Sequence, residues 1–350
     1  MVRLLVGVVF IISGFVKLVD PIGFSFKLEE YFEPHVLDMP FFIPYAYPIA
    51  IFVVAFELIL GVLLLLGYLR NFTLLSLLGL TIFFGFLTFY SAYYNKVTDC
   101  GCFGDALKFT PWGSFTKDMV LLVLAAALWY ARGYISPLFS PQKCLTILVI
   151  TVVACMGLVY YTHNHLPIID FRPYKVGVDI NKAKEIPANA PKAVYDYHWK
   201  FKVGDKEQII TTQGAYPEVE GGTYISVKTE LVSKGYEPPV HDFVIMKDGE
   251  DVTNQILAEP KLLLVTSYDL GKANLEGFRP IKELTDKALK QGYKVIGLTP
   301  SPEKAQELLG QYGLSFDFYA MDVTPLKTMV RANPALIRLE AGTIKQKVSY

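Results

Sequence analysis

The sequence is short of charge and of cysteine and has no basic excess, and these shortages exclude several classes of protein. Its 33 basic residues are balanced by 33 acidic ones, so no positive surplus exists to neutralise a phosphate backbone, and nucleic-acid binding is not expected. Four cysteines in 350 residues exclude a disulfide-dense scaffold. With 52% hydrophobic and 19% charged residues and a mean hydropathy of +0.35, the chain is too apolar for an ordinary soluble protein. Part of it is therefore expected to contact the lipid bilayer.

Five long apolar runs lie in the first half of the chain, where charged residues are sparse. Each is close to the length that crosses the hydrocarbon core of a membrane. The fourth is the shortest and reaches spanning length only if residues 115–118 lie at the membrane interface. The runs cover residues 2–19, 44–69, 72–90, 119–134 and 145–161. The sequence therefore predicts a multi-pass membrane protein with five transmembrane helices.

The charges between these runs predict their orientation. Basic residues without acidic neighbours occupy the N-terminus and two of the connections, and acidic residues dominate the other two; the basic ones are Arg3, Arg70, Arg132 and Lys143. By the positive-inside rule the N-terminus is cytoplasmic, and everything after residue 161 lies on the periplasmic side of a bacterial inner membrane. A cleaved signal peptide is the alternative for the first run, but residues 17–21 offer no small-residue cleavage site.

Two ionisable residues fall inside the predicted spans. Glu57 lies near the centre of the second run and Lys17 near the outer end of the first. An unpaired carboxylate at that depth is costly, and a lysine stem is long enough to reach it, so one interpretation is an ion pair. The alternative is that Lys17 extends to the outer headgroups while Glu57 stays protonated. A proton-relay role for Glu57 is a further hypothesis.

Residues 99–105, Asp-Cys-Gly-Cys-Phe-Gly-Asp, are the one stretch that points to a specific chemistry. Cys100 and Cys102 lie in the second outer connection, and Gly101 permits the bend that a disulfide between them requires. Such a ring would be strained, which suits an exchanging disulfide better than a structural one. Free loop thiols are an alternative. A zinc site is not predicted, because the spacing is not that of a zinc knuckle and no histidine is near.

Several stretches of the membrane half resemble DoxX/MauE-type membrane proteins. They are residues 13–21, residues 57–67, and Asp99 to Gly104 ahead of Lys117 and Asp118. The resemblance covers roughly residues 1–135 and implies a four-helix transmembrane bundle associated with thiol and quinone redox chemistry. It also implies a part in disulfide formation in a periplasmic enzyme. This chain adds a fifth span and a large outer region.

The outer half reads as two parts. Residues 194–203 and 207–213 flank Gly204-Asp205-Lys206 and predict a β-hairpin. After residue 238 the order changes to an α/β alternation that resembles a thioredoxin-like domain of the TlpA/peroxiredoxin kind, with Asn333-Pro334 at the position of a cis-proline. The matching Cys-x-x-Cys stretch, residues 268–274, contains no cysteine, and none follows Cys155. His241 is interpreted as a structural histidine, and Asp269 as the cap of the segment after it.

The predicted fold is thus a four-helix DoxX/MauE-like bundle with a fifth transmembrane helix, followed by a periplasmic α/β thioredoxin-like domain. The expected parts are residues 1–135, the fifth helix at 136–166, a β-rich module at 167–237 and the thioredoxin-like domain at 238–350. The first hypothesis for function is a redox-associated protein in which Cys100 and Cys102 exchange with a quinone or with the thiols of a periplasmic or membrane partner. The second is a non-enzymatic scaffold of an envelope complex, and a transporter is a third.

Overall fold

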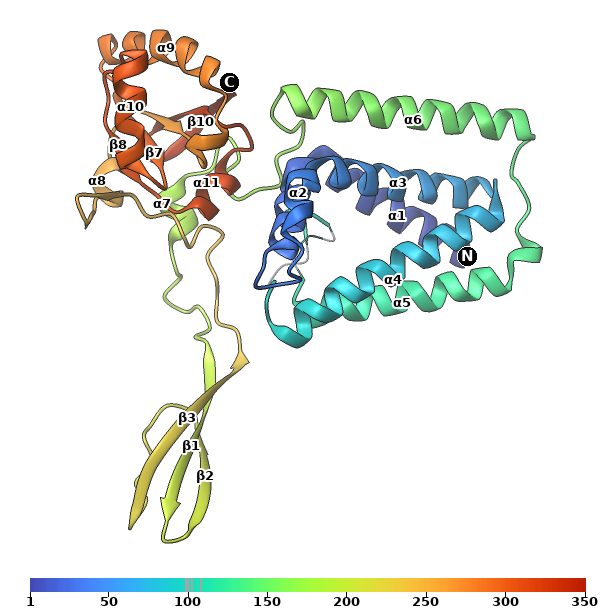
Figure 1. Ribbon diagram of the computed structural model, residues 1–350, viewed down its shortest axis with the longest axis horizontal. Coiled ribbons are helices and arrows are strands. Elements are labelled where there is room, and N and C mark those ends of the chain that lie inside the picture. The colour runs from blue at the N-terminus through green and yellow to red at the C-terminus, as the bar shows by residue number, and fades with distance from the viewer. Residues whose placement is uncertain (98–100, 102, 108) are drawn as a thin grey trace.

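The computed structural model describes residues 1–97, 101, 103–107 and 109–350, which form a helical bundle, an α/β domain and a projecting β-arm (Figure 1). Among the described residues, five helices are long and apolar enough to cross a membrane. They are α1 (Val2–Val19), α3 (Ala46–Leu66), α4 (Arg70–Tyr94), α5 (Pro111–Tyr130) and α6 (Pro141–Asn164). The prediction of five apolar helices is confirmed. Helix α5 begins earlier than its apolar run because the Thr110 hydroxyl caps it and Pro111 suits its first turn.

Small residues let α1 and α3 approach closely. A Cβ atom added to Gly14 of α1 would lie 2.7 Å from the backbone nitrogen of Leu58. At Gly61 of α3, atoms of α1 leave equally little space for a Cβ atom. Close backbone packing of this kind holds helices together in lipid, where burial of apolar surface gives no advantage. It also brings Lys17 next to Glu57.

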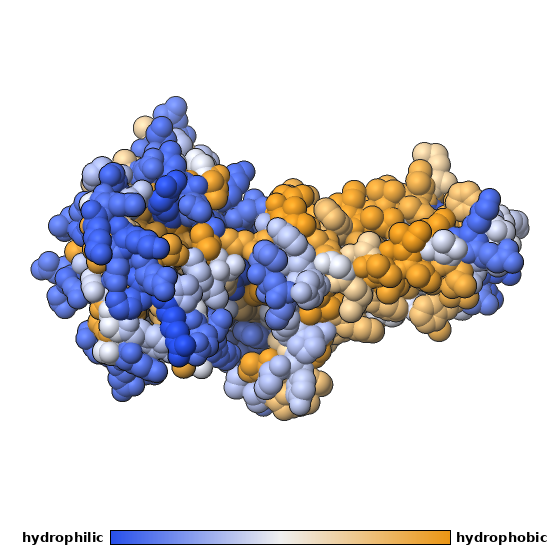
Figure 2. All heavy atoms as spheres, turned by 90° about the horizontal axis from the view of Figure 1, so that it is seen from above, coloured by the Kyte–Doolittle hydropathy of each residue, from blue (hydrophilic) through white to orange (hydrophobic). Residues whose placement is uncertain are grey.

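Helix α6 lies at the edge of the bundle. It packs mainly along α3, and only Cys144, Cys155 and Thr162 among its residues are buried. Figure 2 shows apolar residues covering the helical half, whereas the α/β domain presents a largely hydrophilic surface. This division is the one expected for a membrane half and an aqueous half.

The two ends of the bundle differ in chemistry. At the end that holds the N-terminus, the Arg3 guanidinium donates to the carbonyl oxygens of Leu64 and Leu65 at 2.8 and 2.5 Å, where a cation complements the C-terminus of α3. The opposite end carries α2 (Pro21–Phe32), which we did not predict from the sequence. The Asp20 carboxylate accepts a hydrogen bond from Gly23 N–H at 3.0 Å and Pro21 follows it, so the helix-start signal is present in the sequence.

The α/β domain is built on a seven-stranded mixed sheet in the order β10-β9-β6-β7-β8-β4-β5. Strands β6, β7 and β8 are parallel, and β9, β10, β4 and β5 are antiparallel to their neighbours. The strands are β4 (Met246–Lys247), β5 (Glu250–Asp251), β6 (Leu262–Thr266), β7 (Lys294–Thr299), β8 (Phe318–Ala320), β9 (Ala335–Glu340) and β10 (Thr343–Ser349). The predicted α/β alternation is confirmed, and the Asn333-Pro334 bond is cis as the sequence suggests.

Helices cover both faces of this sheet, which explains why β6 reads as a continuous apolar run. Leu262 and Leu264 pack into one core, whereas Leu263 and Val265 pack into the other, because side chains of a strand alternate between its faces. The helices are α8 (Thr253–Leu257) and α11 (Val323–Met329) on the first face, and α9 (Phe278–Lys290) and α10 (Pro302–Tyr312) on the second.

The β-arm contains β1 (Val194–Val203), β2 (Lys206–Thr212) and β3 (Gly222–Ser233) in the order β2-β1-β3. The predicted hairpin is β1–β2, and β3 was not predicted. Figure 1 shows the arm projecting away from the rest of the outer half. Before the arm, Tyr174 and α7 (Ile180–Lys184) pack into the core of the α/β domain. Short 3-10 turns cover Pro40–Tyr45, Arg132–Tyr134, Leu270–Lys272 and Leu275–Gly277.

Candidate functional site

Lys17 and Glu57 meet inside the bundle at the end that faces the α/β domain. Their side chains form an ion pair between α1 and α3, and the two residues are only 2% and 3% exposed. The Lys17 ammonium also lies 4.7 Å from the centre of the Phe84 ring and 5.4 Å from that of Phe24. Each of these buried charges depends on the other, because either one alone would lie in the bundle without its counter-charge.

A second buried pair lies beside the first and was missed from the sequence, where residues 115–118 were placed at the interface. The Lys117 ammonium lies 2.6 Å from Oδ1 of Asp118, which is 3% exposed. Thr88 Oγ1 of α4 lies 3.0 Å from Oδ2 of the same carboxylate. The signal that could have found it is an acid and a base inside an apolar helix, opposite a threonine on a neighbouring helix.

Cys100 and Cys102, the predicted redox pair, lie outside the described residues. Gly101 between them has a φ of +65°, a left-handed conformation that glycine adopts without strain. Gly104 N–H donates to the Gly101 carbonyl at 3.0 Å and closes a turn. Gly101 lies against the Lys27 side chain of α2, and Lys117 reaches within 5.4 Å of the Phe103 ring centre. The described part of this motif loop, residues 101 and 103–107, therefore lies over the two ion pairs.

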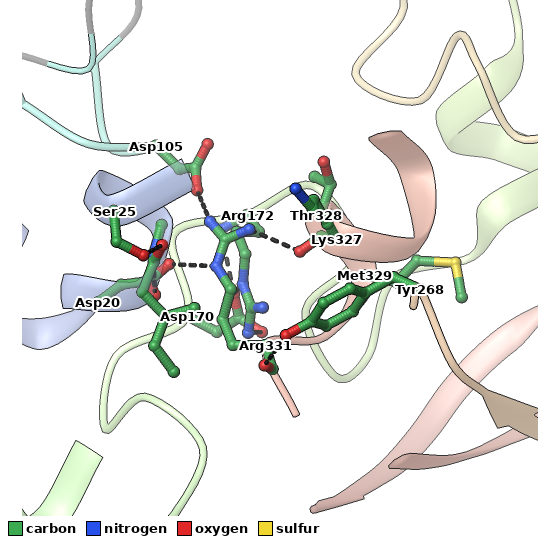
Figure 3. Close-up of polar contacts among 12 residues, drawn as sticks. Asp20, Ser25, Asp105, Asp170, Arg172, Tyr268, Lys327, Thr328, Met329 and Arg331 are labelled. Carbon is green, nitrogen blue, oxygen red and sulfur yellow. Dashed lines mark hydrogen bonds and ion pairs between the residues drawn. The ribbon is translucent and has the colours of Figure 1, made fainter. Parts of the chain in front are cut away.

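Arg331 of the α/β domain joins the motif loop to the bundle (Figure 3). Its Nε lies 2.8 Å from Oδ2 of Asp20 and its Nη2 lies 2.7 Å from Oδ2 of Asp105, and Nη1 donates to the Lys327 carbonyl at 2.6 Å. Burial alone would lower the pKa of Arg331, but Asp20 and Asp105 outweigh it and raise that pKa. The Arg331 guanidinium thus connects the outer domain to the motif loop and to the junction between α1 and α2.

An aromatic contact lies next to this network of Asp20, Asp105 and Arg331. Phe26 of α2 packs edge-on against Tyr268, with ring centres 5.6 Å apart, and the Lys327 ammonium lies 4.2 Å from the Phe26 ring centre. Burial raises the pKa of the Tyr268 hydroxyl to about 12, helped by the charge of Glu29. Tyr268 begins the segment that follows β6, so α2 covers that face of the domain.

A cleft of about 440 Å³ lies between the two halves. Its lining includes Gly101, Gly104 and Asp105 of the motif loop, with residues of α1, α2, α11 and the segment before α7. Lys17 lines its floor, and His241 lies in its wall and contacts the Pro238 carbonyl at 3.3 Å. Asp269 caps the turn that follows it, accepting from Gly271 N–H at 2.9 Å. Among the described residues, no group of three or more His, Cys, Asp or Glu could hold a metal ion.

A second charged cluster in the outer half involves Asp170, Arg172 and Lys347. The Asp170 carboxylate accepts from Arg172 Nε at 2.7 Å and from Lys347 Nζ at 2.9 Å. Its own burial would raise the pKa of Asp170, but these two cations lower it to about 2. Burial, together with the charge of Arg172, lowers the pKa of Lys347 to about 8 in spite of Asp170.

We expect the outer domain, expressed from Leu166, to unfold cooperatively and to become more stable between about pH 8 and pH 10. The unfolded chain holds the Lys347 proton up to its ordinary pKa of 10.5, whereas the folded domain releases it near 8, so the unfolded state binds more protons in this window. The rise should be about 3 kcal/mol at most. Urea unfolding at a series of pH values measures it. Lys347→Met should flatten the curve; an equal rise in this variant would assign it to other groups.

The comparison with protein families gives one match in the membrane half. Residues 1–131 match the family described as methylamine utilisation protein MauE. No curated protein matches the chain. The matched range contains α1 to α5, the motif loop and both buried ion pairs. Residues 1–131 are therefore similar to MauE family domains, and with its five apolar helices the chain fits a MauE-type multi-pass membrane protein.

Proposed function

We propose that the protein is a redox-associated inner-membrane protein in which Cys100 and Cys102 exchange a disulfide with partner thiols or with a quinone. The observation that carries this proposal is the Cys-Gly-Cys-Phe-Gly motif in a MauE family domain. The described motif residues line a cleft that a partner could enter, and the family's description suggests a partner in methylamine utilisation.

The proposed orientation places the N-terminus in the cytoplasm and the α/β domain in the periplasm. Support comes from Arg3, Arg70 and Arg132, which belong to the end of the bundle opposite the outer domain, since connections rich in lysine and arginine stay in the cytoplasm. A reporter that is active only in the periplasm should work when fused after Tyr350 and should be silent when fused at Arg70. The reverse pattern would refute this orientation.

The outer domain is proposed to be a thioredoxin-like docking module. Its central strands follow the α/β alternation of that fold, but no cysteine follows Cys155, so it has no thiol with which to exchange a disulfide. Its contacts through Arg331 and Tyr268 support a different role, which is to hold the motif-bearing end of the bundle.

Thiol labelling of membranes tests the redox proposal. A membrane-impermeant maleimide should label Cys100 and Cys102 only after mild reduction, because thiols on the oxidising side form a disulfide and a strained ring is readily reduced. Cys144 and Cys155 are buried in α6 and serve as internal references that should stay unlabelled. Cys100→Ser with Cys102→Ser gives the matched background. Labelling of both thiols before reduction would contradict the proposal.

The contacts of α2 favour a second candidate, a non-enzymatic scaffold. Phe26 and Glu29 of α2 already occupy the face of the outer domain around Tyr268 and Lys327. In this candidate, the membrane half covers the face of the outer domain that would otherwise react. The domain then serves to assemble an envelope complex. In that case loss of Cys100 and Cys102 should leave the protein's association with its partner unchanged.

A further inference from the structure

The two buried ion pairs of the bundle face one small cavity. Its charged lining consists of Lys17, Glu57, Lys117 and Asp118. Helix α4 adds the hydroxyl of Thr81, and the other lining residues are Val9, Phe10, Ser13, Phe84, Phe103 and Leu121. Among the residues that the structure describes, two cations and two carboxylates from three helices therefore surround a single space and balance in charge.

The size of this cavity decides what it can hold. Its volume is about 20 Å³. One water needs roughly 10–15 Å³ and two or more polar partners, whereas sites for small organic ligands have about 300–1,000 Å³. The cavity therefore fits a single water and is too small for a quinone ring.

The cavity has a route to water at the outer end of the bundle. Lys17 lines both this cavity and the 440 Å³ cleft below the outer domain. The side chain of Lys117 is 22% exposed, which gives the second pair its own contact with the surface. The first pair is thus buried beneath the cleft, and the second reaches the surface through the Lys117 side chain.

We propose that Lys17, Glu57, Lys117 and Asp118 form one proton-exchange site, joined by a buried water and reached from the cleft. A hydronium ion in the cleft gives its proton to a carboxylate oxygen of Glu57 or Asp118 and leaves as water, so the site gains one net positive charge, and the reverse step returns the proton to water. Among the described residues, the polar groups that line it are these four charged side chains and the hydroxyls of Ser13 and Thr81. The site stands whether or not Cys100 and Cys102 exchange electrons.

Carbodiimide labelling of the full-length protein in nanodiscs tests whether the two pairs act together. Dicyclohexylcarbodiimide modifies protonated carboxyl groups in apolar surroundings, and peptide mass spectrometry locates the adduct. In the wild type, Glu57 and Asp118 should both resist labelling. Lys117→Met removes one positive charge from the shared site. The site should then bind a proton to restore the balance, and Glu57 and Asp118 should share that proton. Labelling of both Glu57 and Asp118 should then rise about tenfold or more, and Lys17→Met should have the same effect.

The matched control is Lys282→Met, which removes a partly exposed lysine of α9 that pairs with Asp286 outside the site. It should leave Glu57 and Asp118 unlabelled. Labelling of Asp118 alone in Lys117→Met would show independent pairs and overturn the proposal. A cryo-EM map of the wild type gives a measurement that does not depend on folding of a variant. Density for one water within hydrogen-bonding distance of both pairs is the expected result, and a dry cavity would overturn the shared site.

Discussion

Replacing Lys17 or Glu57 alone should destabilise the bundle far more than replacing both. Lys17→Met leaves a carboxylate at a position that is 3% exposed, and Glu57→Gln leaves an ammonium at one that is 2% exposed. Removal of one member of a buried pair costs about 3–5 kcal/mol, because the remaining group either keeps an unpaired charge or must bind or release a proton to lose it. The double variant has no buried charge at this place, so it should recover most of that loss.

Unfolding of the full-length protein in detergent, followed by tryptophan fluorescence, gives the four stabilities of this double-mutant cycle. The control is Lys27→Met, whose pair with Glu30 is about one-third exposed and should contribute under about 1 kcal/mol. A double variant that is no more stable than either single variant would show that the two side chains do not interact.

Arg331→Met should release the outer domain from the bundle. The substitution leaves Asp20 and Asp105 facing each other without the guanidinium that now contacts both at 2.8 and 2.7 Å. Hydrogen bonds to charged groups contribute about 1.5–3 kcal/mol each, so loss of two should raise the population of the undocked state about 100-fold or more. Hydrogen exchange of the motif loop and of α2 should accelerate accordingly.

Two variants make this experiment specific. Arg279→Met removes an arginine of the same domain whose pair with Glu276 is largely exposed, and exchange should be unchanged. Arg331→Lys keeps the charge but not the planar fork that contacts two carboxylates, so it should recover only part of the protection. Equal protection in wild type and Arg331→Met would mean that other contacts hold the domain in place.

The membrane half was largely predictable, because its signals are local. The hydrophobicity of a run such as residues 2–19 directly indicates a membrane span. Lys17 and Glu57 are recognisable as the ionisable residues inside two such runs. The α/β alternation after residue 238 was predictable for the same reason, since β6 is a continuous apolar run and α10 has the apolar spacing of a helix.

The contacts that build the site were not predictable from local pattern. Asp20 and Arg331 are 311 positions apart, and nothing in the residues around either one specifies the other. Helix α2 was missed because its polar residues resemble those of a loop, although they contact the outer domain. The pairing of Asp118 was not predicted, since only the packing of α4 against α5 shows that Thr88 lies beside it.

Trapping of mixed disulfides in cells tests the central claim, that Cys100 and Cys102 exchange with a partner, most directly. Replacing one cysteine by alanine leaves the other without its resolving thiol, so an intermediate that is normally transient should accumulate. Cys100→Ala or Cys102→Ala should give a higher-mass species that disappears on reduction, and the double variant should give none. Absence of such a species in both single variants, in cells where the protein is expressed and correctly inserted, would contradict the exchange and leave the scaffold as the better account.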